Sequence, residues 1–128
     1  AGSDIRFTNG NWTGNAYGKI QHHADCLYIA GGNQSNYSII FRYDGTDRIY
    51  MKSDGTWYPA TNNASDLGTT SKRWRNIYTT DLQLSNEGKT NDVDGTWGDF
   101  TIQEGESDLF LINNRNGKKY KFNLTEVS

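Results

Sequence analysis

The chain has 128 residues, of which 34% are hydrophobic and 13% aromatic, and its net charge is −2. The hydrophobic share lies below the ~45–50% usual for soluble domains, but the many aromatic and β-branched residues argue against disorder. The sequence has no basic patch typical of nucleic-acid binding and no apolar run near the ~18 residues that span a membrane, so we expect neither nucleic acid nor a membrane as a partner. Cys26 is the single cysteine, which favours assembly in a reducing compartment.

Short β-favouring runs, separated by Gly, Asn and Asp, follow one another along the chain. No window has a sustained helical period, and only Ser71–Arg75 is expected to form a helical turn, with Ser71 as its cap. The pattern predicts an all-β fold of short strands and hairpins. The expected strands are Ile5–Thr8, Tyr17–His22, Cys26–Ala30, Ser38–Tyr43, Arg48–Lys52, Thr56–Tyr58, Asn76–Leu84, Phe100–Gln103, Leu109–Ile112 and Tyr120–Leu124.

Three dipeptides predict the tight turns of β-hairpins. Asp44-Gly45, Asp54-Gly55 and Asn116-Gly117 each lie between two expected strands, and such pairs tolerate the positive φ angles of these turns. The composition changes near residues 59–71, which are rich in Thr, Asn, Ser and Gly and contain the only Pro. We therefore expect an N-terminal β unit at 1–60, a linker followed by a strand at 61–85, and a hairpin-rich tail at 86–128.

The most distinctive stretch, residues 66–78, reads D-L-G-T-T-S-K-R-W-R-N-I-Y. It resembles a short signature near the C-terminal parts of bacteriophage tail fibres and tailspikes, in which β-rich chains wind together as trimers. Residues 98–122 also resemble C-terminal segments of structural proteins from marine phages. The resemblance implies an intertwined homotrimeric β-structure in the virion, assembled in the host cytoplasm. Core or inter-subunit packing is then expected for Leu67, Trp74, Ile77 and Tyr78.

Enzymatic activity is not expected. Spike glycosidases use paired carboxylates on scaffolds larger than this chain, and the acidic pairs here fall in turn-like contexts. A self-cleaving chaperone domain often follows a similar signature, but it uses a Ser/Lys pair in a helix-bearing domain, and the 50 residues after Tyr78 read as hairpins. No cofactor is implied. The acidic pairs are Asp44 with Asp47, Asp92 with Asp94, and Glu104 with Glu106.

His22 and His23 are weak candidates for metal ligands. Neighbouring residues on a regular strand point to opposite faces, so the pair cannot chelate one ion. In a trimer, a histidine on the three-fold axis would be repeated three times, and three imidazoles can hold a transition metal. Partly exposed histidines without a metal are the preferred interpretation.

Aromatic residues set among Asn, Thr, Asp and Gly are the candidates for ligand binding. Sugars stack on aromatic rings, although the same rings are also suited to a hydrophobic core. Trp57 and Trp97 are preferred because each follows an Asp-Gly-Thr turn, and turns lie at the surface. The expected glycan-binding residues are Trp12, Trp57, Tyr58 and Trp97.

The expected function is host-surface recognition, with trimerisation of the fibre as a second role. The partners are then further copies of the chain and a host-cell polysaccharide or other receptor. Two other classes stay open, a monomeric carbohydrate-binding β-sandwich and a purely architectural virion protein.

Overall fold

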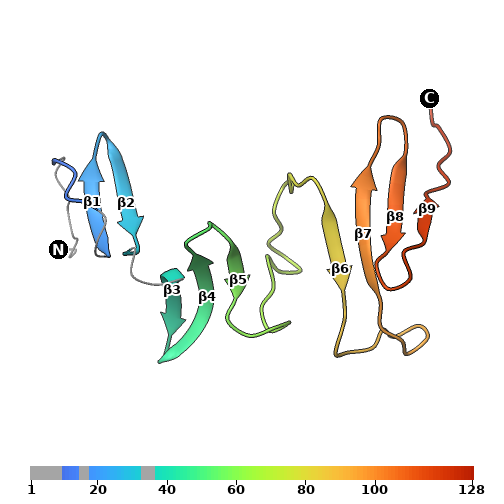
Figure 1. The fold of residues 1–128 in the computed structure, drawn as a ribbon, viewed down its shortest axis with the longest axis horizontal. Helices are drawn as coiled ribbons and strands as arrows, with labels where there is room; N and C mark the ends of the chain where they lie inside the picture. Colours follow the sequence, from blue (N-terminus) through green and yellow to red (C-terminus); the bar gives the residue numbers. More distant parts are fainter. Residues whose placement is uncertain (1–9, 15–17, 33–36) are drawn as a thin grey trace. The chain divides into compact units, whose positions relative to one another are not determined.

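The structure is a computed structural model that describes residues 10–14, 18–32 and 37–128 (Figure 1). These residues form strands and loops without any helix, which confirms the predicted all-β fold. Their strands are β1 (Lys19–His23), β2 (Cys26–Ala30), β3 (Tyr37–Tyr43), β4 (Thr46–Lys52), β5 (Trp57–Pro59), β6 (Leu82–Ser85), β7 (Asp99–Glu104), β8 (Leu109–Asn113) and β9 (Lys119–Lys121).

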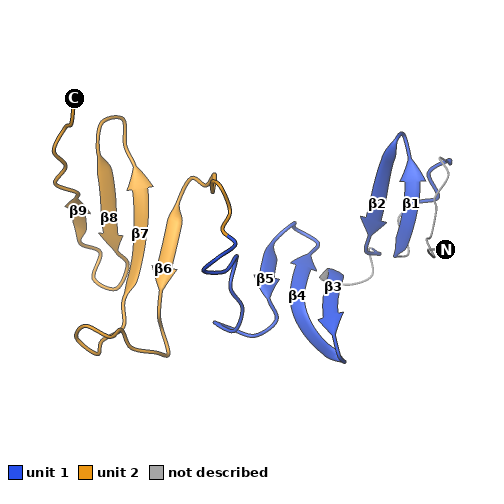
Figure 2. Ribbon diagram, turned by 180° about the vertical axis from the view of Figure 1, so that it is seen from behind, with its two compact units in different colours: residues 1–72 blue, residues 73–128 orange. Residues whose placement is uncertain are grey.

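The strands form three antiparallel sheets of consecutive neighbours, β1-β2, β3-β4-β5 and β6-β7-β8-β9. The chain divides into two compact units, residues 1–72 with the first two sheets and residues 73–128 with the third (Figure 2). The three-part division expected from the sequence remains a prediction.

The three predicted hairpin turns are confirmed. Asp44 and Gly45 connect β3 to β4 with φ angles of 48° and 71°, next to the paired residues Tyr43 and Thr46. In the β4–β5 loop, the Asp54 carboxylate accepts a 2.9 Å hydrogen bond from the Thr56 N–H. The turn between β8 and β9 contains Gly117 at φ 74°. Each turn therefore sets the register of the pair that it joins.

A fourth hairpin, between β1 and β2, has no such dipeptide. Ala24 and Asp25 occupy its turn with φ angles of 48° and 62°, so both are left-handed without glycine. Alanine is unfavourable in this conformation, which explains why the sequence did not predict a turn here.

Two expectations around the signature were wrong. The strand expected at Asn76–Leu84 begins only at Leu82, because β6 has a partner strand, β7, from that residue onward. The helical turn expected at Ser71–Arg75 is absent from this fully described segment. Instead, the Lys72 N–H donates to the Thr69 hydroxyl oxygen at 3.0 Å, and the Thr69 N–H donates to the Lys72 carbonyl at 2.8 Å. These two bonds close a small loop in place of a helix.

Most other strand boundaries differ from the sequence expectation by one to three residues, and two expectations fall partly or wholly outside the described residues. The strand expected at Tyr120–Leu124 spans Lys119–Lys121, although the Phe122 N–H still donates to the Leu109 carbonyl at 3.0 Å. The strand at Ile5–Thr8 and the first residue of Tyr17–His22 are among the residues that the structure does not describe.

The sheets lack a buried hydrophobic layer. Among the described residues, no hydrophobic side chain is buried, and Thr101, at 5% exposure, is the only buried polar one. The ladder hydrogen bonds are therefore formed without the apolar packing that normally accompanies them.

The tight turns supply a first test of this fold. Gly45→Ala is expected to lower the free energy of unfolding by about 1 kcal/mol, because alanine is strained at a φ of 71°. Gly10→Ala is the control, since Gly10 lacks a positive φ and an added Cβ would meet no atom within 4 Å. Urea denaturation of the intact protein, followed by tryptophan fluorescence, measures both. Equal effects of the two changes would contradict the assigned turn.

Candidate interaction surfaces

The signature stretch, defined as residues 66–78, leaves its large apolar side chains in solvent. Leu67 is 76% exposed, Trp74 64%, Ile77 70% and Tyr78 92%. The stretch has no strand, and the backbone bonds between Thr69 and Lys72 shape it locally. Their packing in a core or between subunits therefore remains a prediction.

Trp12 packs beside the β1-β2 hairpin. Its ring meets the Tyr28 ring edge-on at 5.1 Å, and the Lys19 ammonium lies 3.3 Å from the ring centroid. The Gln21 amide donates to the Asn11 carbonyl and anchors the same segment. A cation–π contact thus occupies one face of this indole.

Trp57 and Tyr58 are neighbours on β5 and therefore point to opposite faces of the β3-β4-β5 sheet. Trp57 is 59% exposed, and its ring centroid lies 5.5 Å from that of Phe41. Tyr58 is half-buried and contacts Tyr50 edge-on at 5.5 Å. The structure thus separates these two predicted glycan-binding residues.

Trp97 follows a loop that Asn and Asp side chains hold in place. The Asn86 amide oxygen accepts from the Gly98 N–H at 2.7 Å, and the Asn91 amide donates to the Thr96 carbonyl at 2.8 Å. The Arg115 guanidinium carbon lies 3.8 Å from the Trp97 ring centroid, and its Nη1 donates to the Trp97 carbonyl at 2.9 Å. One face of the indole is therefore already occupied.

A polar hollow lies beside this stacked pair. Its lining combines amide, carboxylate and hydroxyl groups with the indole, and it comes from the loop before β7 and the turn after β8. Sequence reasoning missed Arg115 and the amides because their positions are far apart in the chain and become neighbours only through strand pairing. The hollow is lined by Asn91, Asp94, Thr96, Trp97, Arg115 and Asn116, among others.

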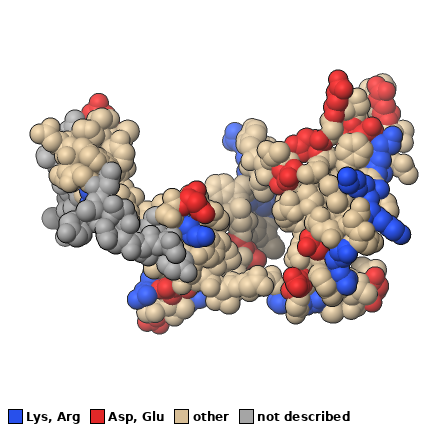
Figure 3. All heavy atoms as spheres, viewed as in Figure 1, with Lys and Arg blue, Asp and Glu red and all other residues tan. Residues whose placement is uncertain are grey.

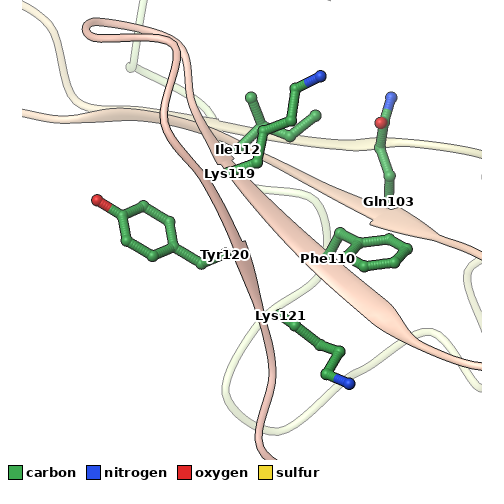
Figure 4. A pocket seen from close by; sticks show the side chains of 6 residues that line it. All are labelled: Gln103, Phe110, Ile112, Lys119, Tyr120 and Lys121. Carbon is green, nitrogen blue, oxygen red and sulfur yellow. The ribbon is translucent and has the colours of Figure 1, made fainter.

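A second hollow lies on one face of the C-terminal sheet (Figure 4). Phe110 and Ile112 from β8 contribute its apolar part, with Gln103 from β7 and Lys119 and Lys121 from β9 around them. The Lys121 ammonium forms an ion pair with Asp108 at 3.5 Å. In Figure 4, the Tyr120 ring points to the other side of the strand from Ile112 and Lys119.

Three aspartates accept hydrogen bonds that lower the pKa of their carboxyl groups. Hydrogen bonds from the Thr96 hydroxyl, the Asn91 amide and the Thr96 N–H lower the pKa of Asp94. The Thr56 N–H lowers the pKa of Asp54, and the Arg42 guanidinium followed by the Tyr50 hydroxyl lowers that of Asp47. These hydrogen bonds therefore stabilise the three carboxylates in their charged form.

Acidic and basic side chains are interspersed on the face seen in Figure 3. That distribution agrees with the near-neutral net charge of −2 and offers no single-sign surface on the visible face. The described residues contain no helix that is long and apolar enough to cross a membrane.

The two candidate histidines lie on opposite faces of β1. The His23 Nδ1 atom is 2.6 Å from the Gly10 carbonyl oxygen, so this ring is tied to the N-terminal segment. The His22 Nδ1 atom is shielded from solvent and has no hydrogen-bond partner among the described residues. In this part of the chain, no group of three His, Cys, Asp or Glu side chains is placed to hold a metal ion.

Comparisons with protein-family models, with curated proteins and with solved structures found no match. Interpretation of these surfaces therefore depends on the geometry above and on the resemblance of residues 66–78.

The loop before β7 supplies a pH-dependent test. Because folding lowers the pKa of Asp94, its stabilising hydrogen bonds are present above the ordinary aspartate pKa of ~3.9 and are lost as the pH falls through the lowered value. The Thr96 amide resonance is therefore expected to move only at strongly acidic pH, and Asp94→Asn abolishes that transition. NMR titration measures it, with Asp92→Asn as a control in the same loop. A transition that survives Asp94→Asn would contradict this assignment.

Proposed function

We propose that this chain is a segment of a bacteriophage tail fibre or tailspike that assembles as a homotrimer and recognises a host-cell surface polysaccharide without enzymatic activity. The observation that carries the proposal is the exposure of the apolar residues of the signature stretch. In a fibre, this segment belongs to the virion and assembles in the host cytoplasm.

The signature stretch holds apolar side chains in solvent on a locally bonded backbone. Trp74 and Tyr78 are 64% and 92% exposed, although full burial of a large apolar side chain stabilises by roughly 1.5–3 kcal/mol. Exposed apolar patches mark sites of association, and these side chains all come from one short segment, residues 66–78. Another subunit would recover the burial that the single chain lacks.

Glycan recognition is supported by aromatic rings in polar surroundings. The contacts described above occupy one face of Trp12 and one of Trp97, and Tyr58 is half-buried. Trp57 is the most exposed of the four candidates, and its ring lies beside that of Phe41, so we take it to offer the largest ring surface to a sugar. It is therefore the first candidate for stacking on a sugar.

The oligomeric state tests the trimer. Native mass spectrometry, with light scattering at micromolar concentration, is expected to give three times the 14.5 kDa mass of the chain. The double change Trp74→Ala and Tyr78→Ala removes exposed apolar surface and is expected to weaken assembly at least ~10-fold. Val93→Ala is the control, because Val93 is 96% exposed but lies outside the signature stretch. A monomer at these concentrations would sink the proposal and favour the carbohydrate-binding sandwich.

Binding to polysaccharides from bacterial envelopes tests recognition. Trp57→Ala is expected to reduce binding on a glycan array at least ~10-fold through loss of the stacking surface. Trp97→Ala is the companion variant and is expected to have a smaller effect, because Arg115 already covers one face of that ring. If the wild-type trimer bound neither polysaccharide nor whole cells, a purely architectural role would replace recognition.

A further inference from the structure

The hollow of Figure 4 brings two lysines and an aromatic ring together on one face of the C-terminal sheet. Strand register places Gln103 opposite Phe110, and Phe110 opposite Lys121, across β7, β8 and β9. Ile112 and Lys119 form the next pair on the same face, because residues two apart on a strand share a face. The alternation of β9 therefore places both of its lysines beside the Phe110 ring.

The Phe110 ring is held against the backbone at Gly105. A Cβ added at Gly105 would lie 2.6 Å from the Phe110 Cε2 atom, so only glycine leaves room for the ring in this position. The Gly105 N–H donates to the Asp108 carbonyl at 2.8 Å and closes the turn between β7 and β8. Phe110 is still 36% exposed, so part of its surface is open to a ligand.

The described residues that line the hollow include two cationic groups and no acidic one. Lys121 forms an ion pair with Asp108, whereas the Lys119 ammonium has neither an ion pair nor a hydrogen bond with any described residue. The Gln103 Nε2 atom donates to the Asp81 carboxylate at 3.2 Å, which leaves the Gln103 amide oxygen free to accept. Asp81 precedes β6, so β7 and β8 lie between it and the lysines. The hollow is therefore positive at its β9 side.

Lysines on an edge strand also have a simpler role, because their charge discourages pairing with another sheet. That role accounts for the charge of β9, but it requires neither an aromatic ring nor an amide beside the lysines. The hollow has a volume of about 440 Å³, within the ~300–1,000 Å³ of ligand sites. A nucleic-acid strand requires a basic groove along its phosphates, whereas the cations here come from one strand of three residues. A small anionic group attached to a ring fits better.

We propose that this hollow binds a carboxylate-bearing sugar of an acidic polysaccharide. The Lys119 ammonium pairs with the sugar carboxylate through a charge-assisted hydrogen bond. The Phe110 ring contacts the C–H face of the pyranose, and the Gln103 amide oxygen accepts from a hydroxyl group. This inference rests on the proposed recognition of a host polysaccharide and adds that the polysaccharide is acidic.

NMR titration of the intact protein with sodium glucuronate tests the site, with methyl glucoside at the same ionic strength as the uncharged control. Glucuronate is expected to shift the Phe110 ring and Lys119 side-chain resonances and to bind about fivefold more tightly than the glucoside, which is the most that one exposed ion pair normally contributes. Lys119→Gln is expected to abolish this preference. Lys118→Gln is the matched control, because Lys118 is also exposed but does not line the hollow.

Gly105→Ala tests the ring without removing any group that contacts the sugar. The added Cβ displaces the Phe110 ring, and the backbone tolerates alanine because Gly105 lacks a positive φ. Both sugars are expected to bind more weakly, while the preference for glucuronate persists. Unchanged amide resonances of β7 and β8 establish that the sheet remains folded.

The outcomes separate this inference from the proposed function. Equal binding of the two sugars, or an undiminished preference in Lys119→Gln, would overturn the acidic site. Displacement of glucuronate by an oligothymidylate that binds more tightly would replace it with a nucleic-acid site. If glucuronate did not bind while Trp57-dependent binding to polysaccharides persisted, this inference would fall and the proposed function would stand. Glucuronate binding at the hollow, without binding to any polysaccharide or cell, would support the site and overturn host recognition.

Discussion

The constraint on which the rest of this structure depends is the lack of a hydrophobic layer within the described part of the chain. Backbone hydrogen bonds define three small sheets, but isolated sheets of two to four strands are marginal in water unless one face is covered. Each ladder orders residues at an entropic cost that apolar burial normally helps to offset. The proposed trimer would supply that burial through contacts between subunits.

The tight turns determine which side chains share each face of a sheet. A slip of one residue in any hairpin moves every apolar side chain to the opposite face. In the C-terminal sheet, the turn at Gly117 fixes β9 against β8 and thereby places Tyr120 beside Leu111. A glycine at positive φ thus determines which side chains share a face, because its turn sets the register of the paired strands.

The sequence predicted those features that depend on neighbouring residues. The dipeptides at Asp44 and Asn116 located hairpins, and alternation located most strands, whereas the first hairpin has an alanine, Ala24, in the left-handed region, where glycine or asparagine is usual. The strand expected from Asn76 failed because β-propensity requires a partner strand. The packing of Arg115 on Trp97, 18 positions apart, could not be predicted because it depends on the pairing of β7 with β8.

Aromatic side chains serve both subunit packing and sugar binding, so the same residue types compete for two roles. In the C-terminal sheet, Tyr120 shares a face with Leu111, whereas Lys119 shares the other face with Ile112, so both faces contain apolar side chains. In the β3-β4-β5 sheet, the Trp57 ring lies beside the Phe41 ring. If a subunit covered that face, Trp57 would no longer be accessible to a sugar ligand. Recognition would then fall to polar hollows such as the one beside Trp97, where hydrogen bonds rather than stacking select the sugar.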